Sequence, residues 1–151
     1  MASFLRDAKV LEADVIAIQE PWRNELNETT RQPAARTHQL LYPKESEYGE
    51  PGGARVALYV SKNMDPGSWQ HTVVSRDYRL LRINYNRGEI PRSLFIHNIY
   101  NEPRSGTLER LRQELTKINE VEYAENLILG DFNAHHPAWG GPGVQWNRRV
   151  N

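Results

Sequence analysis

The 151-residue sequence contains no cysteine, which excludes disulfide bonds, zinc sites built on thiolates and cysteine nucleophiles. It also lacks any apolar run approaching the ~20 residues that a membrane-spanning helix needs. Its first residues, Met1–Asp7, mix acidic and basic side chains where a signal peptide would have an apolar core. We therefore expect a soluble protein of a reducing compartment, with no membrane partner.

Charge of one sign is not in excess either, because 19 Lys and Arg residues balance 19 Asp and Glu residues. Proteins that bind nucleic acid tightly and without sequence preference usually carry a basic surplus, so the balance argues mildly against that role. The apolar fraction of 38% suffices for a hydrophobic core. A single domain over residues 1–151 is expected, since ~100–200 residues per domain is usual.

Apolar periodicity predicts a mixture of helices and strands. Helical spacing of apolar side chains predicts helices at Phe4–Leu11 and Leu108–Ile118, the second capped by Ser105 or Thr107. Strands are predicted at Val15–Ile18, Gln39–Tyr42, Val56–Val60, Thr72–Ser75, Tyr78–Tyr85, Leu94–Tyr100 and Leu127–Leu129. The first and last of these strands are expected to be buried. The segment 43–53 is expected to be turns, and the fold class is α/β with a mostly antiparallel sheet.

Three of the apolar strands end in polar residues that can carry chemistry. Glu20 follows the first strand, Tyr100 and Asn101 end another, and Asp131 and Asn133 follow the last. Any one of these residues alone would fit an ordinary surface loop. Three such strand ends predict a shared cleft, because strand ends at one edge of a sheet converge.

The types of these residues predict phosphate chemistry at a divalent metal. Glu20 and Asp131 are hard oxygen ligands suited to Mg²⁺ or Mn²⁺. Asn133 lies two residues beyond Asp131, so both side chains share one face of an extended chain. The amide of Asn133 and the hydroxyl of Tyr100 could orient a phosphate. Carboxylates, metal and neutral donors together are the equipment of phosphodiester hydrolysis.

Three segments carry a specific resemblance: Ile18–Trp22 (Ile-Gln-Glu-Pro-Trp), Asn98–Asn101 (Asn-Ile-Tyr-Asn) and Leu129–Gly140, which contains Gly-Asp-Phe-Asn. In this order they resemble the endonuclease/exonuclease/phosphatase superfamily, and Gly130–Gly140 is most similar to the endonuclease domains of non-LTR retrotransposons. The resemblance implies an α+β fold: a two-layer β-sandwich flanked by helices, in an incomplete four-layer DNase I-like arrangement.

The resemblance also implies roles for individual residues. Glu20 is expected to bind the catalytic Mg²⁺ (or Mn²⁺) together with Asp131, and Tyr100, Asp131 and Asn133 are the expected catalytic residues. The expected substrate-binding residues are Asn101, Asn133, His135 and His136. His135 and His136 could also replace the general base, but a loop role beside the site is favoured because neither has an evident orienting carboxylate.

Two features of the family pattern are not found. Members usually begin with a strand carrying an Asn, and they end with a Ser-Asp-His strand whose histidine is the expected general base. Neither segment is recognisable here, and Pro103 stands where many members have an Asn, with Asn101 nearby. We therefore expect residues 1–151 to form a domain that lacks both segments and has impaired activity.

The leading functional hypothesis is a Mg²⁺-dependent DNA endonuclease that nicks a target strand. The resemblance implies a DNA substrate, a longer polyprotein with a reverse transcriptase, and a nuclear location. An inositol-phosphate or sphingolipid phosphohydrolase is a competitor within the same superfamily. The alternative from another class is a non-catalytic, truncated remnant that binds nucleic acid or protein. The sequence does not indicate an oligomeric state.

Overall fold

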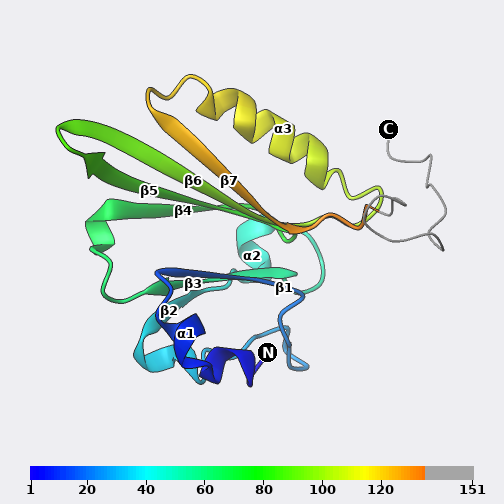
Figure 1. Cartoon of the computed structure of the whole chain (residues 1–151). Coiled ribbons are helices and arrows are strands. Elements are labelled where there is room, and N and C mark those ends of the chain that lie inside the picture. Colours follow the sequence, from blue (N-terminus) through cyan, green and yellow to red (C-terminus); the bar gives the residue numbers. More distant parts are fainter. Residues whose placement is uncertain (135–151) are drawn as a thin grey trace, which may run out of the picture.

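A computed structural model describes residues 1–134, which form two β-sheets (Figure 1). The smaller sheet has the strand order β1-β3-β2, and all of its pairs are antiparallel. Its strands are β1 (Val15–Gln19), β2 (His38–Leu41) and β3 (Val56–Ser61). The apolar runs predicted by the sequence therefore become strands with nearly the expected bounds.

The larger sheet has the order β4-β5-β6-β7. Its strands are β4 (Trp69–Ser75), β5 (Tyr78–Arg87), β6 (Ile90–Tyr100) and β7 (Ala124–Asp131). The pairs β4–β5 and β5–β6 are antiparallel, whereas β7 runs parallel to β6 after a crossover through α3 (Thr107–Ile118). Parallel strands need such a crossover, and it leaves the carboxyl ends of β6 and β7 side by side.

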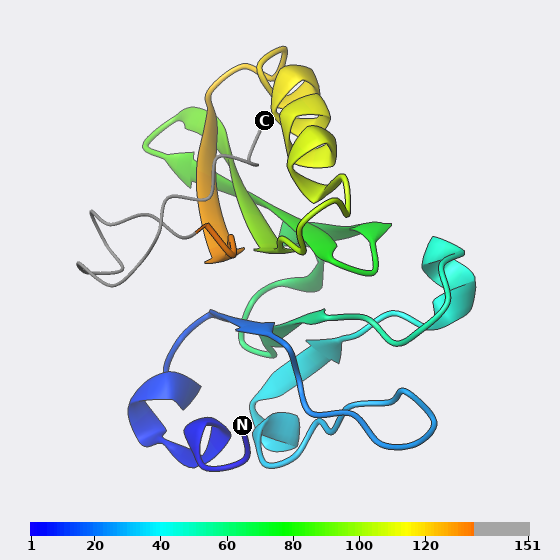
Figure 2. The same cartoon turned by 90° about the vertical axis from the view of Figure 1, so that its right-hand side faces the viewer.

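The two sheets stack face to face and are covered by helices on their outer faces (Figures 1 and 2). The core between the sheets consists of the buried side chains Leu41, Leu58, Val60, Leu81 and Ile96. On the outside, α3 packs through Leu111 and Ile118 against the larger sheet, and Leu5 packs in a cluster with Ile16 of the smaller sheet. The predicted β-sandwich flanked by helices is confirmed.

The first predicted helix is divided in two. Phe4–Arg6 forms a 3-10 turn and α1 covers only Ala8–Leu11. Asp7 separates them because its backbone is extended and its carboxylate caps α1, accepting from the Lys9 N–H at 2.8 Å. The periodicity of the apolar residues does not reveal this break. No helix within residues 1–134 is long and apolar enough to cross a membrane.

Two further expectations need correction. The segment 43–53, expected to be rich in turns, also contains the helix α2 (Glu45–Tyr48), which begins where the Lys44 N–H donates to Glu47 Oε2 at 2.6 Å and ends at the left-handed Gly49. The helix α3 begins after Gly106, which has no side chain to cap it, and the Ser105 hydroxyl accepts from the Thr107 N–H at 3.3 Å. The start of α2 is thus marked by the contact between Lys44 and Glu47, and the start of α3 by the contact between Ser105 and Thr107.

The strands β1 and β7 are not buried as predicted. β3 is central and buried at every position, but β1 is mostly half-buried and β7 is mostly exposed. Leu127 and Ile128 of β7 are 43% and 39% exposed. Within the described chain both strands lie at a sheet edge, so they have a neighbour on one side only. An apolar run does not distinguish a central strand from an edge strand.

Candidate functional site

The predicted site residues up to Asn133 lie at one edge of the sandwich, where β1, β6 and β7 end. Figure 2 looks onto this edge. The parallel register of β6 and β7 places Tyr100 opposite Asp131, and β1 packs against both strands. Glu20 follows β1 directly. The convergence follows from the topology, because these three strands point the same way across two stacked sheets.

Tyr100 joins the predicted residues of two strand ends. The side chains of Glu20 and Asn133 both lie near enough to its phenol to act on its pKa. The pKa of Tyr100 is raised, first by the hydrogen bond with the Glu20 carboxylate and then by burial, while Asn133 and the charge of Arg55 act in the opposite direction. Tyr100 is therefore a neutral hydroxyl at physiological pH. The structure thus brings Glu20, Tyr100 and Asn133 together.

Glu20 is held in an unusual backbone conformation. Its φ angle is +47°, in the left-handed region, and this turns the chain sharply out of β1. A residue with a Cβ pays about 1 kcal/mol or more for this conformation. Two contacts maintain it: the Glu20 N–H donates to the Arg55 carbonyl at 2.8 Å, and the neighbouring Gln19 amide donates to Asn98 Oδ1 at 2.6 Å.

Asn98 fastens the two sheets together directly behind Glu20. It lies on β6, is completely buried, and donates through Nδ2 to the carbonyls of Ala57 at 2.9 Å and Ile18 at 3.3 Å. With the bond from Gln19, one amide of the larger sheet contacts both β1 and β3 of the smaller sheet. Buried polar groups persist only when they are paired, so this clamp fixes the position of the end of β1.

The end of β7 is organised by short-range contacts. Asp131 Oδ1 accepts from the Asn133 N–H at 2.9 Å, which closes a tight turn. The Asp131 carbonyl accepts from the Asn101 N–H at 2.7 Å, so the loop after β6 is tied to this turn. Asn133 has a left-handed φ of +47°, a conformation that Asn tolerates well. Asp131 itself remains exposed.

The two loops that follow β6 and β7 are also joined through side chains. Asn133 Nδ2 donates to the Asn101 carbonyl at 2.8 Å, and Asn101 Nδ2 donates to the Phe132 carbonyl at 2.8 Å. Asn101, predicted as a substrate-binding residue, thus connects the loops with its amide nitrogen. Because both loops are cross-linked, Tyr100 and Asn133 are held at a fixed separation.

Gly130 is required for the close approach of β6 and β7. A Cβ at this position would lie 2.1 Å from the Ile99 carbonyl oxygen and 2.7 Å from Ile99 Cγ1. The oxygen belongs to the backbone of the neighbouring strand and cannot move aside. The glycine that precedes Asp131 in the sequence motif therefore has a steric role in setting the distance to Tyr100.

A charged cluster that the sequence did not reveal lies beside Tyr100. Arg55 donates from Nε and Nη2 to both carboxylate oxygens of Asp77 at 2.6 Å, and its Nη1 pairs with Glu102 at 2.6 Å. These partners raise the pKa of Arg55, Asp77 first. The guanidinium lies 4.7 Å from the centre of the Tyr100 ring, and the Tyr100 N–H donates to the Asp77 carbonyl at 2.8 Å.

No sequence signal marks this cluster. Arg55 precedes β3 and Asp77 precedes β5, at positions where charged residues usually face solvent. Only the stacking of the two sheets brings them together, and Asp77 becomes 3% exposed. Arg55 is thus a positioning residue, since it supports the ring of Tyr100 and neutralises a buried carboxylate.

Glu20 and Asp131 are the carboxylates of this edge that could hold a cation. Tyr100 links them structurally, by its bond with Glu20 and by its register with Asp131. Within residues 1–134, no group of three or more His, Asp or Glu side chains forms a preassembled metal cluster. The predicted residues His135 and His136 lie outside the described residues.

Comparison with known proteins agrees with the motifs and with the fold. A family model described as "Endonuclease-reverse transcriptase" matches residues 94–149, which contain the strand ends of β6 and β7. The comparison with curated proteins finds no match.

Solved structures resemble the chain in fold. One is humanised TDP2 of D. rerio, with a TM-score of 0.52 and 16% sequence identity over 87% of this chain and 57% of that chain. Another is ANGEL2, a 2′,3′-cyclic phosphatase, with a TM-score of 0.53 and 18% identity over 93% of this chain and 44% of that chain. The chain therefore spans about half the length of each. The family match over residues 94–149 and the likeness in fold agree with the resemblance of the sequence motifs to the endonuclease/exonuclease/phosphatase superfamily.

Proposed function

We propose that the chain is part of a divalent-metal-dependent DNA endonuclease that hydrolyses a phosphodiester bond. The observation that carries this proposal is the convergence of three strand ends at one edge, which places Tyr100 opposite Asp131 and beside Glu20 and Asn133. A carboxylate, a hydroxyl and an amide at one exposed edge provide a cation ligand and neutral donors for a phosphate.

The donor set fits Mg²⁺ or Mn²⁺. Glu20 and Asp131 offer carboxylate oxygens, and Asp131 is exposed beside Tyr100. Mg²⁺ typically takes one or two protein carboxylates and keeps several waters, so two such residues suffice. When bound, the ion would supply Lewis-acid stabilisation of the phosphate charge and a more acidic water.

The side chains of the site have distinct tasks in this proposal. The Tyr100 hydroxyl keeps its proton because its pKa is raised, and in the complex it would turn this proton from Glu20 to a non-bridging phosphate oxygen. One Asn133 N–H donates to the Asn101 carbonyl, which orients the amide so that its second N–H can meet the same phosphate. Asp131 uses Oδ1 to hold the turn, and its other oxygen, Oδ2, accepts a proton of the attacking water.

The biological setting is proposed from the family match. Its description names an endonuclease joined to a reverse transcriptase, which supports a longer polyprotein with both activities. Such a protein would nick chromosomal DNA to start reverse transcription, and it would act in the nucleus.

Nicking of supercoiled plasmid tests the proposal. We expect relaxation with Mg²⁺ that is lost with a chelator and in Glu20→Gln, because Gln removes the charge that holds the cation. Glu89→Gln is the matched control, since Glu89 is exposed in the β5–β6 turn. Nicking that survives Glu20→Gln would contradict the proposal. DNA binding without metal-dependent nicking by the wild type would instead identify a non-catalytic binding module.

A further inference from the structure

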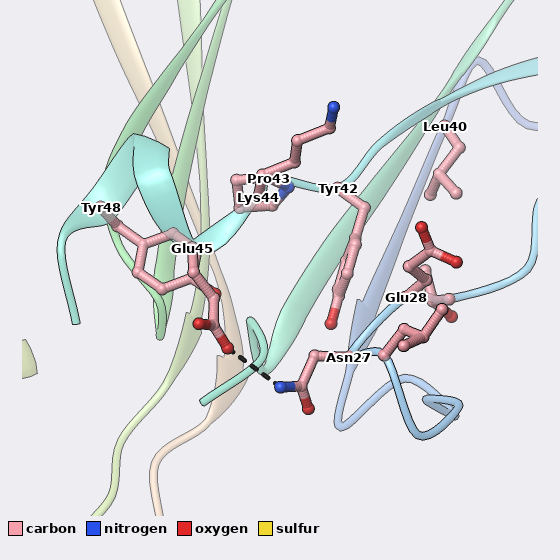
Figure 3. A pocket seen from close by; sticks show the side chains of 10 residues that line it. Asn27, Glu28, Leu40, Tyr42, Pro43, Lys44, Glu45 and Tyr48 are labelled. Carbon is pink, nitrogen blue, oxygen red and sulfur yellow. Dashed lines mark hydrogen bonds between the residues drawn. The ribbon is translucent and has the colours of Figure 1, made fainter. Parts of the chain in front are cut away.

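A cleft lies beside Tyr42, just after β2 (Figure 3). Because β1 and β2 both run antiparallel to the central strand β3, the cleft is at the same edge as Glu20 but on the other side of β3. It has a volume of about 530 Å³ and is lined by the loop 26–29, by Leu40 and Tyr42 at the end of β2, and by α2 with Tyr48. Asn27 Nδ2 donates to Glu45 Oε1 at 2.9 Å and joins the loop to the helix. The cleft is therefore built by three segments far apart in sequence.

Two tyrosines of the cleft are anchored so that their rings are the available contact surfaces. The Tyr42 hydroxyl donates to the Ala54 carbonyl at 3.0 Å, and the Tyr48 hydroxyl donates to the Gly52 carbonyl at 2.9 Å. Burial is the main cause that raises the pKa of both tyrosines, so their rings stay neutral. A fixed, half-buried and uncharged aromatic ring is suited to stacking, because little flexibility is lost on contact.

The cleft and the site of Glu20 share one backbone segment. The Tyr42 hydroxyl bonds to Ala54, and the next residue, Arg55, accepts from the Glu20 N–H and places its guanidinium over Tyr100. The strand order β1-β3-β2 puts Glu20 and Tyr42 on opposite sides of β3. A substrate strand leaving Tyr100 along this edge therefore reaches the cleft after crossing the start of β3.

Two arginines flank that crossing. Arg23 Nη1 donates to the Gly53 carbonyl at 2.9 Å, and Arg76 Nη1 donates to the Pro51 carbonyl at 2.7 Å. Both charges lie near Tyr42, because each lowers its pKa against the larger effect of burial. Arginines in such places neutralise backbone phosphates, as in grooves that bind single strands.

We propose that this cleft receives a nucleobase of the substrate strand, at a nucleotide next to the phosphodiester held by Tyr100. The inference rests on the proposed function and deepens it by assigning a subsite. The volume is within the ~300–1,000 Å³ typical of small-ligand sites. Tyr42 and Tyr48 supply stacking surfaces, and the carboxylate of Glu28 at the rim can accept from an exocyclic amino group. The positive charges of Arg23 and Arg76 would balance the negative charges of the backbone phosphates between Tyr100 and the cleft.

Equilibrium binding of labelled single-stranded oligonucleotides tests the subsite, with metal chelated so that cleavage plays no part. Tyr48→Phe keeps the ring and loses only the hydroxyl, whereas Tyr48→Leu loses the ring. Since stacking of one base is worth a factor of about 5 to 150, we expect Tyr48→Leu to weaken binding by that factor and Tyr48→Phe, which keeps the ring and loses only its anchor, to weaken binding much less. Tyr123→Leu is the matched control, because Tyr123 is 48% exposed away from the cleft.

A second measurement separates stacking from a loss of folding. In a series of oligonucleotides with one abasic nucleotide at successive positions, the wild type should lose affinity at one position and Tyr48→Leu should not. Equal affinities of wild type and Tyr48→Leu, or equal losses in Tyr48→Phe and Tyr48→Leu, would overturn the subsite. Plasmid nicking by the same proteins reports separately on the endonuclease, because only that assay requires Glu20.

Discussion

The two carboxylates of the site, Glu20 and Asp131, are positioned in opposite ways. Asp131 is set by its own neighbourhood: a turn closed by the Asn133 N–H and the adjacent parallel strand. Glu20 is set by residues distant in sequence, the carbonyl of Arg55 and, through Gln19, the amide of Asn98. A short motif can therefore encode the geometry around Asp131, whereas the geometry around Glu20 depends on the stacking of both sheets.

The largest effect is expected from removing the hydrogen bonds by which Asn98, distant in sequence, holds the end of β1. Asn98→Leu keeps a similar volume but leaves the Gln19 amide without its partner and removes the second hydrogen bond of the carbonyls of Ile18 and Ala57, which stay paired in the β1–β3 ladder. Each buried polar group without a partner costs ~1–3 kcal/mol, so the free energy of unfolding should fall by about 3 kcal/mol. Urea denaturation measures this change. Asn86→Leu, at an exposed position of β5, should be neutral; equal losses in both variants would disprove the clamp.

The second largest effect is expected from removing the hydroxyl of Tyr100, which lies between Glu20 and the end of β7. Tyr100→Phe should lower the nicking rate by about 100-fold, the typical effect of losing one donor to developing charge. Stability should hardly change, because the ring still lies under Arg55. Tyr85→Phe is the matched control, since Tyr85 also donates to a carboxylate, Glu125, at 3.0 Å. A similar rate loss in Tyr85→Phe would refute a special role of Tyr100.

The geometry around Asp131, which neighbouring residues set, is tested by Gly130→Ala. The added Cβ would meet the Ile99 carbonyl at 2.1 Å, so β7 must move away from β6. Overpacking of this kind costs ~1–3 kcal/mol, and we expect a loss of about 2 kcal/mol in urea denaturation. Gly88→Ala is an informative companion, because a Cβ at Gly88 meets open space and only its left-handed backbone is strained. Unchanged stability of Gly130→Ala would contradict the steric role.

A gain of stability is expected where the strained backbone of Glu20 is relieved. Glu20→Gly relieves the left-handed φ of +47° and should stabilise the protein by about 0.5 to 1 kcal/mol, after allowing for the flexibility of glycine. The same change should abolish nicking, because the carboxylate is lost. Glu20→Gln should abolish nicking without the gain in stability. If Glu20→Gly is less stable than the wild type, the backbone strain at Glu20 is not released by glycine.

The smallest effect concerns a titration. The Glu20 carboxylate is the first cause that raises the pKa of Tyr100, so Glu20→Gln should move that pKa back towards 10.0. The phenol is then deprotonated at a lower pH, and the stability linked to its proton is lost earlier as pH rises. NMR of tyrosine Cζ signals, with Tyr100→Phe to assign the peak, measures the shift. An unchanged pKa would mean that the two groups do not interact.

The strand ends could be predicted from the sequence because apolar runs and the polar residues that follow them are local patterns. Glu20, Tyr100 and Asn133 were candidates for this reason, and the structure brings them together. The roles of these residues stay predictions until the variants are measured. The motif with Asn98 was also visible, but not the contacts of its amide with the other sheet.

The remaining features could not be predicted because they depend on tertiary packing. Arg55 and Asp77 look like surface residues until the sheets stack and bury their ion pair. The exposure of Leu127 and the burial of β3 depend on which strand is central, and an apolar run carries no such information. Short-range capping at Asp7 and at α2 competes with periodicity, so helix boundaries were the least predictable part.

The crossover between β6 and β7 leaves a surface turn far from the candidate site. The turn 119–123 between α3 and β7 lies at the end of the sandwich opposite to the ends of β6 and β7 (Figure 1). Residues inserted there would lengthen a surface loop without changing the register that sets Tyr100 opposite Asp131. The fold thus offers a natural insertion point for a fluorophore, an affinity handle or a fused domain, with the edge that carries Glu20 and Tyr100 left free.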